Sequence, residues 1–144
     1  MKYLLVGLGS DIREDDGIGN FLILLLKNYL KDFDFLILNQ LLPEDILYFS
    51  EYEKVFIIDA DITMMAGEVN LKRVKDIPEN NFTYHGVGLK DLLKLGFQLG
   101  YIQGEVYIIS IGVNSINIGD KLSDPLVKIV TDIAEKIVDV IKNC

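Results

Sequence analysis

The stretch GLGSDIREDDGIG, residues 7–19, separates a hydrophobic run at residues 3–6 from a longer one that begins at Phe21. It is rich in glycine and acidic residues and contains almost no bulky apolar side chain. This pattern predicts a strand, an acidic loop and a helix. In an open α/β sheet, the loop that follows the first strand at its carboxyl end lines the ligand crevice. The stretch therefore predicts a fold class and also a place for the functional site.

Hydrophobic periodicity along the rest of the chain extends this prediction. The expected strands cover residues 2–6, 33–38, 54–58, 68–74 and 105–111. The expected helices cover residues 17–31, 43–50, 89–99 and 123–142. The alternation at 68–74 is irregular, which favours a peripheral antiparallel strand. We predict an α/β fold, a three-layer α/β/α sandwich with one domain at residues 1–144 and a mostly parallel sheet of about five strands with one antiparallel strand.

Helical spacing of apolar residues predicts the buried stripes of the first and last helices. In the first helix the expected stripe is Ile18, Phe21, Leu22, Leu25, Tyr29 and Leu30. In the last helix it is Leu126, Ile129, Val130, Ile133, Ile137 and Val140.

Composition excludes several classes of protein. Half of the 144 residues are hydrophobic, yet no apolar run approaches the roughly 20 residues that span a bilayer, so we expect no membrane segment. The net charge of −8 disfavours binding to nucleic acid. The single cysteine, Cys144, excludes disulfides and cysteine metal clusters. The first residues lack the long apolar region of a signal peptide, so we expect a cytoplasmic protein.

A dinucleotide site is the first chemistry that a glycine-rich loop after a strand suggests. The fingerprint G-x-G-x-x-G requires glycine where this chain has Ile12. Asn39 stands where an acid would contact the ribose hydroxyls, and the acids of residues 7–19 oppose a pyrophosphate. Both features argue against this chemistry.

Two other chemistries use residues that follow different strands. Ser10, Asp59 and His85 form the set of a serine hydrolase, but Ser10 lacks the G-x-S-x-G turn. Asp16, Asp59 and His85 form a mixed oxygen and nitrogen set that suits a borderline divalent ion such as nickel or zinc. Each of the three residues Asp16, Asp59 and His85 also has a purely structural explanation. Asp16 and His85 are possible helix caps, His85 for a helix starting at Gly88, and Asp59 is a possible strand terminator.

Four segments, in order, resemble motifs of the hydrogenase maturation proteases, the nickel-dependent endopeptidases that process [NiFe]-hydrogenase large subunits. Residues 7–19 are similar to the family signature G-x-G-N-x-x-x-x-D-[DE]-x-x-G. The other similar segments are Ile57-Ile58-Asp59-Ala60 with Gly67-Glu68-Val69, Thr83-Tyr84-His85 with residues 89–93, and Ile111-Gly112-Val113 with Leu122-Ser123.

The resemblance implies an aspartyl-type endopeptidase that removes the C-terminal extension of a [NiFe]-hydrogenase large-subunit precursor after nickel insertion. It implies that Asp16, Asp59 and His85 contact nickel that the precursor supplies and that serves as the recognition element. No organic cofactor and no catalytic serine are implied. The expected protein acts as a monomer.

The chain departs from the family pattern at three places. Ser10 replaces the usual asparagine, Asn39-Gln40-Leu41 replaces a D-G-G turn, and Asn114-Ser115 replaces a proline. Two alternatives stay open at this point: a non-catalytic module that binds nickel or the precursor, and a serine hydrolase that uses Ser10.

Overall fold

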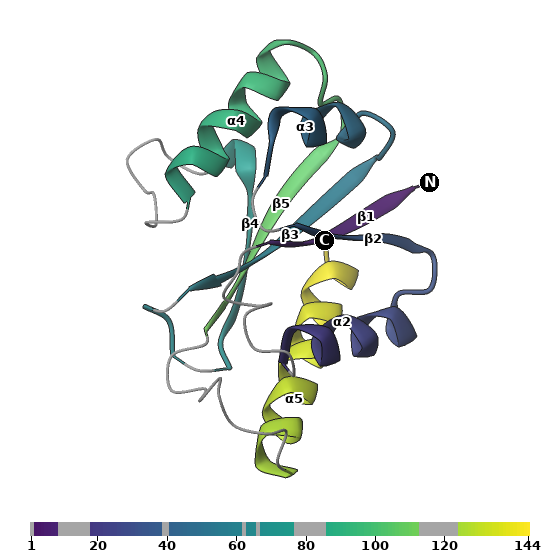
Figure 1. Cartoon of the computed structure of the whole chain (residues 1–144), viewed down its shortest axis with the longest axis vertical. Coiled ribbons are helices and arrows are strands. Elements are labelled where there is room, and N and C mark those ends of the chain that lie inside the picture. The colour runs from purple at the N-terminus through teal and green to yellow at the C-terminus, as the bar shows by residue number, and fades with distance from the viewer. Residues whose placement is uncertain are drawn as a thin grey trace.

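A five-stranded sheet with the strand order β2-β1-β3-β5-β4 forms the centre of the computed structural model (Figure 1). The structure describes residues 2–8, 18–38, 41–61, 63–65, 67–76, 86–112 and 124–144. The strands are β1 (Tyr3–Leu8), β2 (Phe33–Leu38), β3 (Lys54–Asp61), β4 (Val69–Arg73) and β5 (Glu105–Gly112). All neighbouring strands pair in parallel except β4, which is antiparallel to β5. The predicted mostly parallel sheet with one antiparallel strand is confirmed.

Helices cover both faces of this sheet, as the predicted three-layer fold requires (Figure 1). The helices are α2 (Ile18–Tyr29), α3 (Pro43–Phe49), α4 (Gly86–Gln98) and α5 (Asp124–Lys142), and a short 3-10 helix, η1, covers Val74–Asp76. Helices α2 and α5 pack on one face, and α3 and α4 pack on the other. No helix in the described ranges is both long and apolar enough to cross a membrane.

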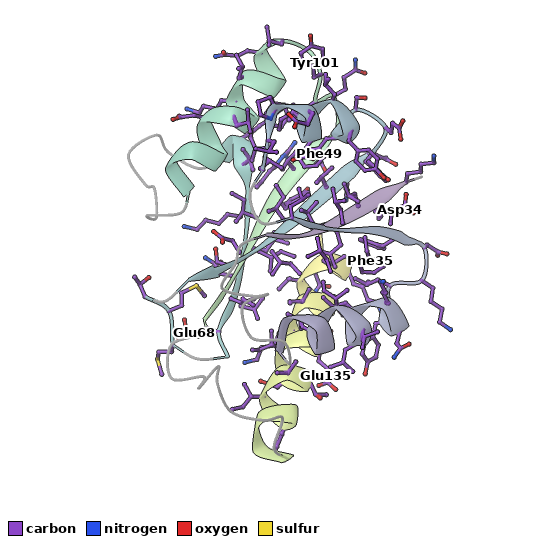
Figure 2. All side chains as sticks on the ribbon, in the orientation of Figure 1. Asp34, Phe35, Phe49, Glu68, Tyr101 and Glu135 are labelled. Atoms are coloured by element: carbon purple, nitrogen blue, oxygen red, sulfur yellow. The ribbon has the colours of Figure 1, made fainter. Side chains whose placement is uncertain are left out.

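Two hydrophobic cores lie between the layers, because alternate residues of a strand point to opposite faces. The core under α2 and α5 contains Phe56 and Ile58 of β3, and the core under α3 and α4 contains Val55 and Ile57. Figure 2 shows Phe35 and Phe49 on opposite sides of the sheet, in line with this division. Since side chains two positions apart share a face, Asp59 lies on the α3/α4 face, beyond Ile57.

Several element boundaries differ from the prediction. β1 continues to Leu8 and β3 continues to Asp61, past the apolar runs that marked them. The strands continue because their backbones stay paired: Leu8 lies opposite Asp59, and Asp61 lies opposite Gly112. Backbone hydrogen bonds do not require apolar side chains, so hydropathy alone places these ends too early. Helix α4 begins at Gly86, three residues before the predicted start.

The predicted stripes were partly wrong. Among the described side chains of α2, Leu22, Ile23 and Leu26 are buried and Leu25 packs half-buried against the core, as does the buried Leu30 just after the helix, whereas Tyr29 is 49% exposed. The predicted stripe residues Ile18 and Phe21 lie outside the described side chains. In the described part of α5, Ile129 is exposed, Val140 packs half-buried against the core, and the buried residues are Val130, Ile133, Ala134, Ile137, Val138 and Ile141. The side chain of the predicted stripe residue Leu126 lies outside the described part. The run FLILLL in α2 is apolar all round the helix, so its spacing does not select one face. Packing on the sheet makes that choice.

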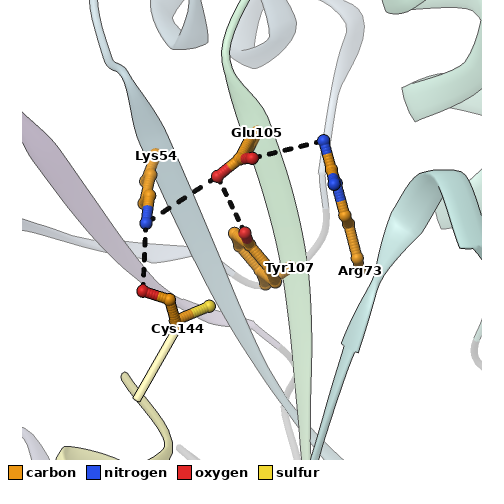
Figure 3. A network of polar contacts seen from close by, with 5 residues as sticks. All are labelled: Lys54, Arg73, Glu105, Tyr107 and Cys144. Carbon is orange, nitrogen blue, oxygen red and sulfur yellow. Dashed lines mark hydrogen bonds and ion pairs between the residues drawn. The ribbon is translucent and has the colours of Figure 1, made fainter. Parts of the chain in front are cut away.

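A polar network surrounds Glu105 at the amino edge of the sheet, where β3 and β5 begin (Figure 3). Tyr107 Oη donates a hydrogen bond of 2.8 Å to Glu105 Oε2, and Arg73 Nη2 lies 3.2 Å from Glu105 Oε1. Lys54 Nζ lies 3.8 Å from Glu105 Oε2 and donates to the backbone oxygen of Cys144 at 3.3 Å. The network therefore connects β3, β4 and β5 with Cys144, two positions after the end of α5.

The pKa of Glu105 is lower than the ordinary value of a glutamate. The hydrogen bond from Tyr107 is the main cause, partial burial opposes it, and the charges of Arg73 and Lys54 lower the pKa further. Burial and hydrogen bonds to Cys144 and Glu105 raise the pKa of Tyr107, so its hydroxyl keeps the proton that it donates. A carboxyl group whose pKa falls on folding stabilises the folded state above its unfolded pKa.

Replacing Glu105 by glutamine should lower the melting temperature at pH 7 by about 2–4 °C, the effect of losing about 1 kcal/mol from a partly exposed charge network. The difference from wild type should shrink as the pH falls from about 4.3, the pKa of an unfolded glutamate, through the lower pKa of folded Glu105, because wild-type Glu105 is neutral below that range. Thermal unfolding, monitored by circular dichroism at pH values from 7 to 3, measures this difference in melting temperature. Glu51→Gln, an exposed carboxylate in the turn after α3, is the control. A difference that does not vary with pH would contradict the assigned role of Glu105.

Candidate functional site

The carboxyl edge of the sheet is where the functional residues were expected. There β1, β3 and β5 end at Leu8, Asp61 and Gly112. Helix α2 begins at Ile18, two residues after Asp16. Asp16 itself lies outside the described residues, as do Ser10, Asn39 and Gln40.

Helix α4 directs its first turn toward the same edge. The N–H groups of Tyr101 and Ile102 donate to the carbonyl oxygen of Gly96 at 3.0 and 3.1 Å, close to the start of β5 at the amino edge. A helix of 13 residues is about 20 Å long, so the other end of α4 points toward the carboxyl edge. His85 precedes this end directly in the sequence, but it lies outside the described part of the chain.

Asp59 is the one expected site residue that the structure describes. It is half-buried on β3, with Leu8 of β1 on one side and Ser110 of β5 on the other. Its carboxylate lies just beyond the hydrophobic core, where Ile57 is fully buried. An aspartate carboxylate in such a position can bind a divalent ion or accept a proton.

A polar row runs from Asp59 to the edge strand of the sheet. Asp59 lies opposite Ser110, and Ser110 lies opposite Asn70 of β4, so the three residues share one face. Ser110 is half-buried and Asn70 is exposed. The sequence interpretation missed Ser110 and Asn70. The sequence did mark Ser110 as unusual, because it interrupts the otherwise apolar second half of β5. Which residues lie beside Ser110 depends on the strand order, which the sequence did not reveal.

The connection between β3 and β4 packs tightly against Gly112 at this edge. A Cβ atom on Gly112 would overlap the backbone of Met65, so only glycine fits there without a backbone shift. Gly67, with φ of +87°, donates from its N–H to the carbonyl oxygen of Gly112 at 3.0 Å. Lys136 of α5 donates to the carbonyl oxygen of Gly67 at 2.8 Å. These contacts hold the carboxyl ends of β5 and β3 beside α5.

Within the part of the chain that the structure describes, no three histidine, cysteine or acidic side chains lie close enough together to hold a metal ion. The predicted set of Asp16, Asp59 and His85 is not tested by this observation, because Asp59 alone of the three is described. Figure 2 shows Glu68 near the start of β4, well away from Tyr101 at the top of the view. Glu68 is exposed, and its carbonyl oxygen begins the antiparallel pairing with β5 by accepting from Gly112 N–H at 2.8 Å.

Solved structures of hydrogenase maturation proteases have the same fold as this chain. The chain is similar to the [NiFe] hydrogenase maturation protease HycI from Thermococcus kodakarensis KOD1, with a TM-score of 0.67 and 18% identity over 98% of this chain and 92% of that chain. For the hydrogenase maturating endopeptidase HybD from E. coli, the TM-score is 0.65, with 16% identity over 99% and 93% of the two chains. For the [NiFe] hydrogenase maturation protease HybD from Thermococcus kodakarensis, it is 0.63, with 26% identity over 99% and 98%.

A family model identifies the chain more directly than these likenesses of fold. Residues 40–140 match the model described as HycI, hydrogenase maturation protease, and no curated protein matches the chain. The matched range is more than half of the sequence, and the chain therefore belongs to the hydrogenase maturation protease family. It is a maturation endopeptidase, and the family acts on hydrogenase precursors. Asp59 and His85 lie inside the matched range, and Asp16 lies outside it.

Proposed function

We propose that this endopeptidase removes the C-terminal extension of a [NiFe]-hydrogenase large-subunit precursor after nickel has been inserted. In this proposal Asp16, Asp59 and His85 contact the nickel, which belongs to the precursor and is part of the substrate. The observation that carries the proposal is the position of Asp59 at the carboxyl edge of β3. The chain segments that contain Asp16 and His85 lead into α2 and α4, whose first turns point toward that edge.

The donor set suits this substrate. Two carboxylates and one imidazole are ligands that a borderline ion such as Ni²⁺ accepts, and they leave positions for ligands of the precursor. A precursor held in this way has its cleavable peptide beside the ion. There the ion can polarise the scissile carbonyl or activate a water molecule. Recognition of nickel would also explain how cleavage waits until the metal has been inserted.

Cleavage should therefore depend on the metal content of the precursor. The protein is incubated with purified large-subunit precursor, once loaded with nickel and once free of it, and the precursor mass is measured by mass spectrometry. We expect a loss of mass, equal to that of the extension, for the nickel-loaded precursor alone. Equal cleavage of both forms would contradict nickel recognition. Binding of the loaded precursor with no change in its mass would instead favour a non-catalytic module.

A further inference from the structure

The polar row consists of Asp59, Ser110 and Asn70, and the proposed metal-binding role of Asp59 does not explain the presence of the other two residues. Ser110 and Asn70 lie on the same face as Asp59, and Asn70 is exposed. The next row toward the amino edge on this face contains Val6, Ile57 and Ile108, which belong to the core or pack against it, and the exposed Lys72 of β4. On β3 and β5 the polar row is therefore the first row beyond the core, and it becomes more exposed from β3 to β4.

The dimensions of the row match a short piece of extended peptide. Neighbouring strands lie about 4.8 Å apart, so Ser110 is about 5 Å and Asn70 about 10 Å from Asp59 across the sheet. An extended chain advances about 3.3–3.6 Å per residue, so about three peptide residues cover this distance. The side chains of serine and asparagine both donate and accept hydrogen bonds. They can thus pair with peptide N–H and C=O groups regardless of the peptide's own side chains.

We infer that Ser110 and Asn70 bind the C-terminal extension of the precursor as it leaves the nickel site and crosses the sheet toward β4. The inference rests on the proposed function, which puts the nickel of the precursor at Asp59. In this arrangement the retained part of the precursor carries the nickel to Asp59, and the extension that follows it in the precursor's chain continues over Ser110 and Asn70. These residues act in binding the substrate, and neither touches the metal.

The chain offers variants that separate substrate binding from folding. Ser110→Ala and Asn70→Ala each remove hydrogen-bonding atoms without adding bulk, and the double variant removes both. Asn28→Ala is the matched control, because Asn28 is an exposed asparagine on α2, at the opposite face of the sheet. Each variant's melting temperature is compared with that of wild type. Because Asn70 is exposed and Ser110 half-buried, we expect the melting temperature to change little.

The test measures binding of a synthetic peptide with the sequence of the extension, since this step requires neither nickel nor cleavage. By isothermal titration calorimetry, each single variant should bind about two- to tenfold more weakly than wild type, the effect of one lost neutral hydrogen bond. The double variant should bind at least tenfold more weakly, while Asn28→Ala should bind as wild type does. In cleavage of nickel-loaded precursor, the double variant should show a raised KM with kcat nearly unchanged.

Equal affinity of wild type and the double variant for the peptide, or no measurable binding by wild type, would overturn the inference whatever the cleavage result. A lower kcat at unchanged KM would also overturn it, because that result assigns the two residues to the chemical step. If the peptide affinities differ as expected while nickel-loaded precursor is not cleaved by wild type, the proposed function fails and peptide binding by the row stands.

Discussion

Replacing Asp59 by asparagine should reduce processing of nickel-loaded precursor by about 10²–10⁴-fold, the range that loss of a reacting acidic group produces. Asparagine keeps the size of the side chain but removes the negative charge that makes an aspartate a strong metal ligand and a base. Asp59 lies half-buried at the end of β3, beyond the core, so the fold should tolerate the change. Precursor mass over time measures the rate, and circular dichroism verifies the fold.

Matched variants separate this role of Asp59 from a general effect of charge. Asp16→Asn and His85→Ala should each cause a loss of similar size, since the proposal gives all three residues the same metal. Asp32→Asn, in the turn between α2 and β2 at the amino edge, removes an equivalent charge away from the site and should process normally. Ser10→Ala should also retain activity. Loss of turnover in Ser10→Ala would instead support a serine hydrolase.

Replacing Phe56 by alanine should destabilise the fold by about 3–5 kcal/mol, the cost of a large cavity in a packed core. Phe56 is fully buried on the central strand β3. Its ring stacks on Tyr107 with the centroids 5.1 Å apart and also lies 6.0 Å from the ring of Phe33. The change therefore removes contacts with both β2 and β5. Because domains unfold with a free energy of about 5–15 kcal/mol, a loss of this size is a large share of the total.

Thermal or urea unfolding measures the effect. The melting temperature should fall by roughly 6–20 °C, at about 2–4 °C for each kcal/mol. Leu24→Ala is the control, because Leu24 is apolar but 60% exposed on α2, and it should change stability by no more than about 0.5 kcal/mol. If Phe56→Ala does not fold, Phe56→Leu gives a smaller loss that is still measurable. A melting temperature within 2 °C of wild type for Phe56→Ala would contradict its place in the core.

The candidate site was only partly predictable from the sequence. The motif around Asp59 could be recognised because a carboxylate directly after a buried apolar run is a local pattern. Ser110 and Asn70 could not be placed beside Asp59 in this way. Their neighbourhood depends on β3 pairing with β5 and on β5 pairing with β4, contacts between segments far apart in the chain. The network at Glu105 could not be predicted from the sequence for the same reason, since it joins Lys54, Arg73 and Tyr107 across three strands.

The sequence by itself determined how many strands the sheet has and which segments are strands or helices. Apolar runs and helical spacing carry this information because they express local preferences of the backbone. It also determined that the acidic residue Asp59 directly follows the buried apolar run of a strand. The tertiary structure alone decided the strand order, the register and the face of α2 that is buried. These features follow from which long-range pairings bury the most apolar surface while satisfying backbone hydrogen bonds, and no local window of sequence contains that information.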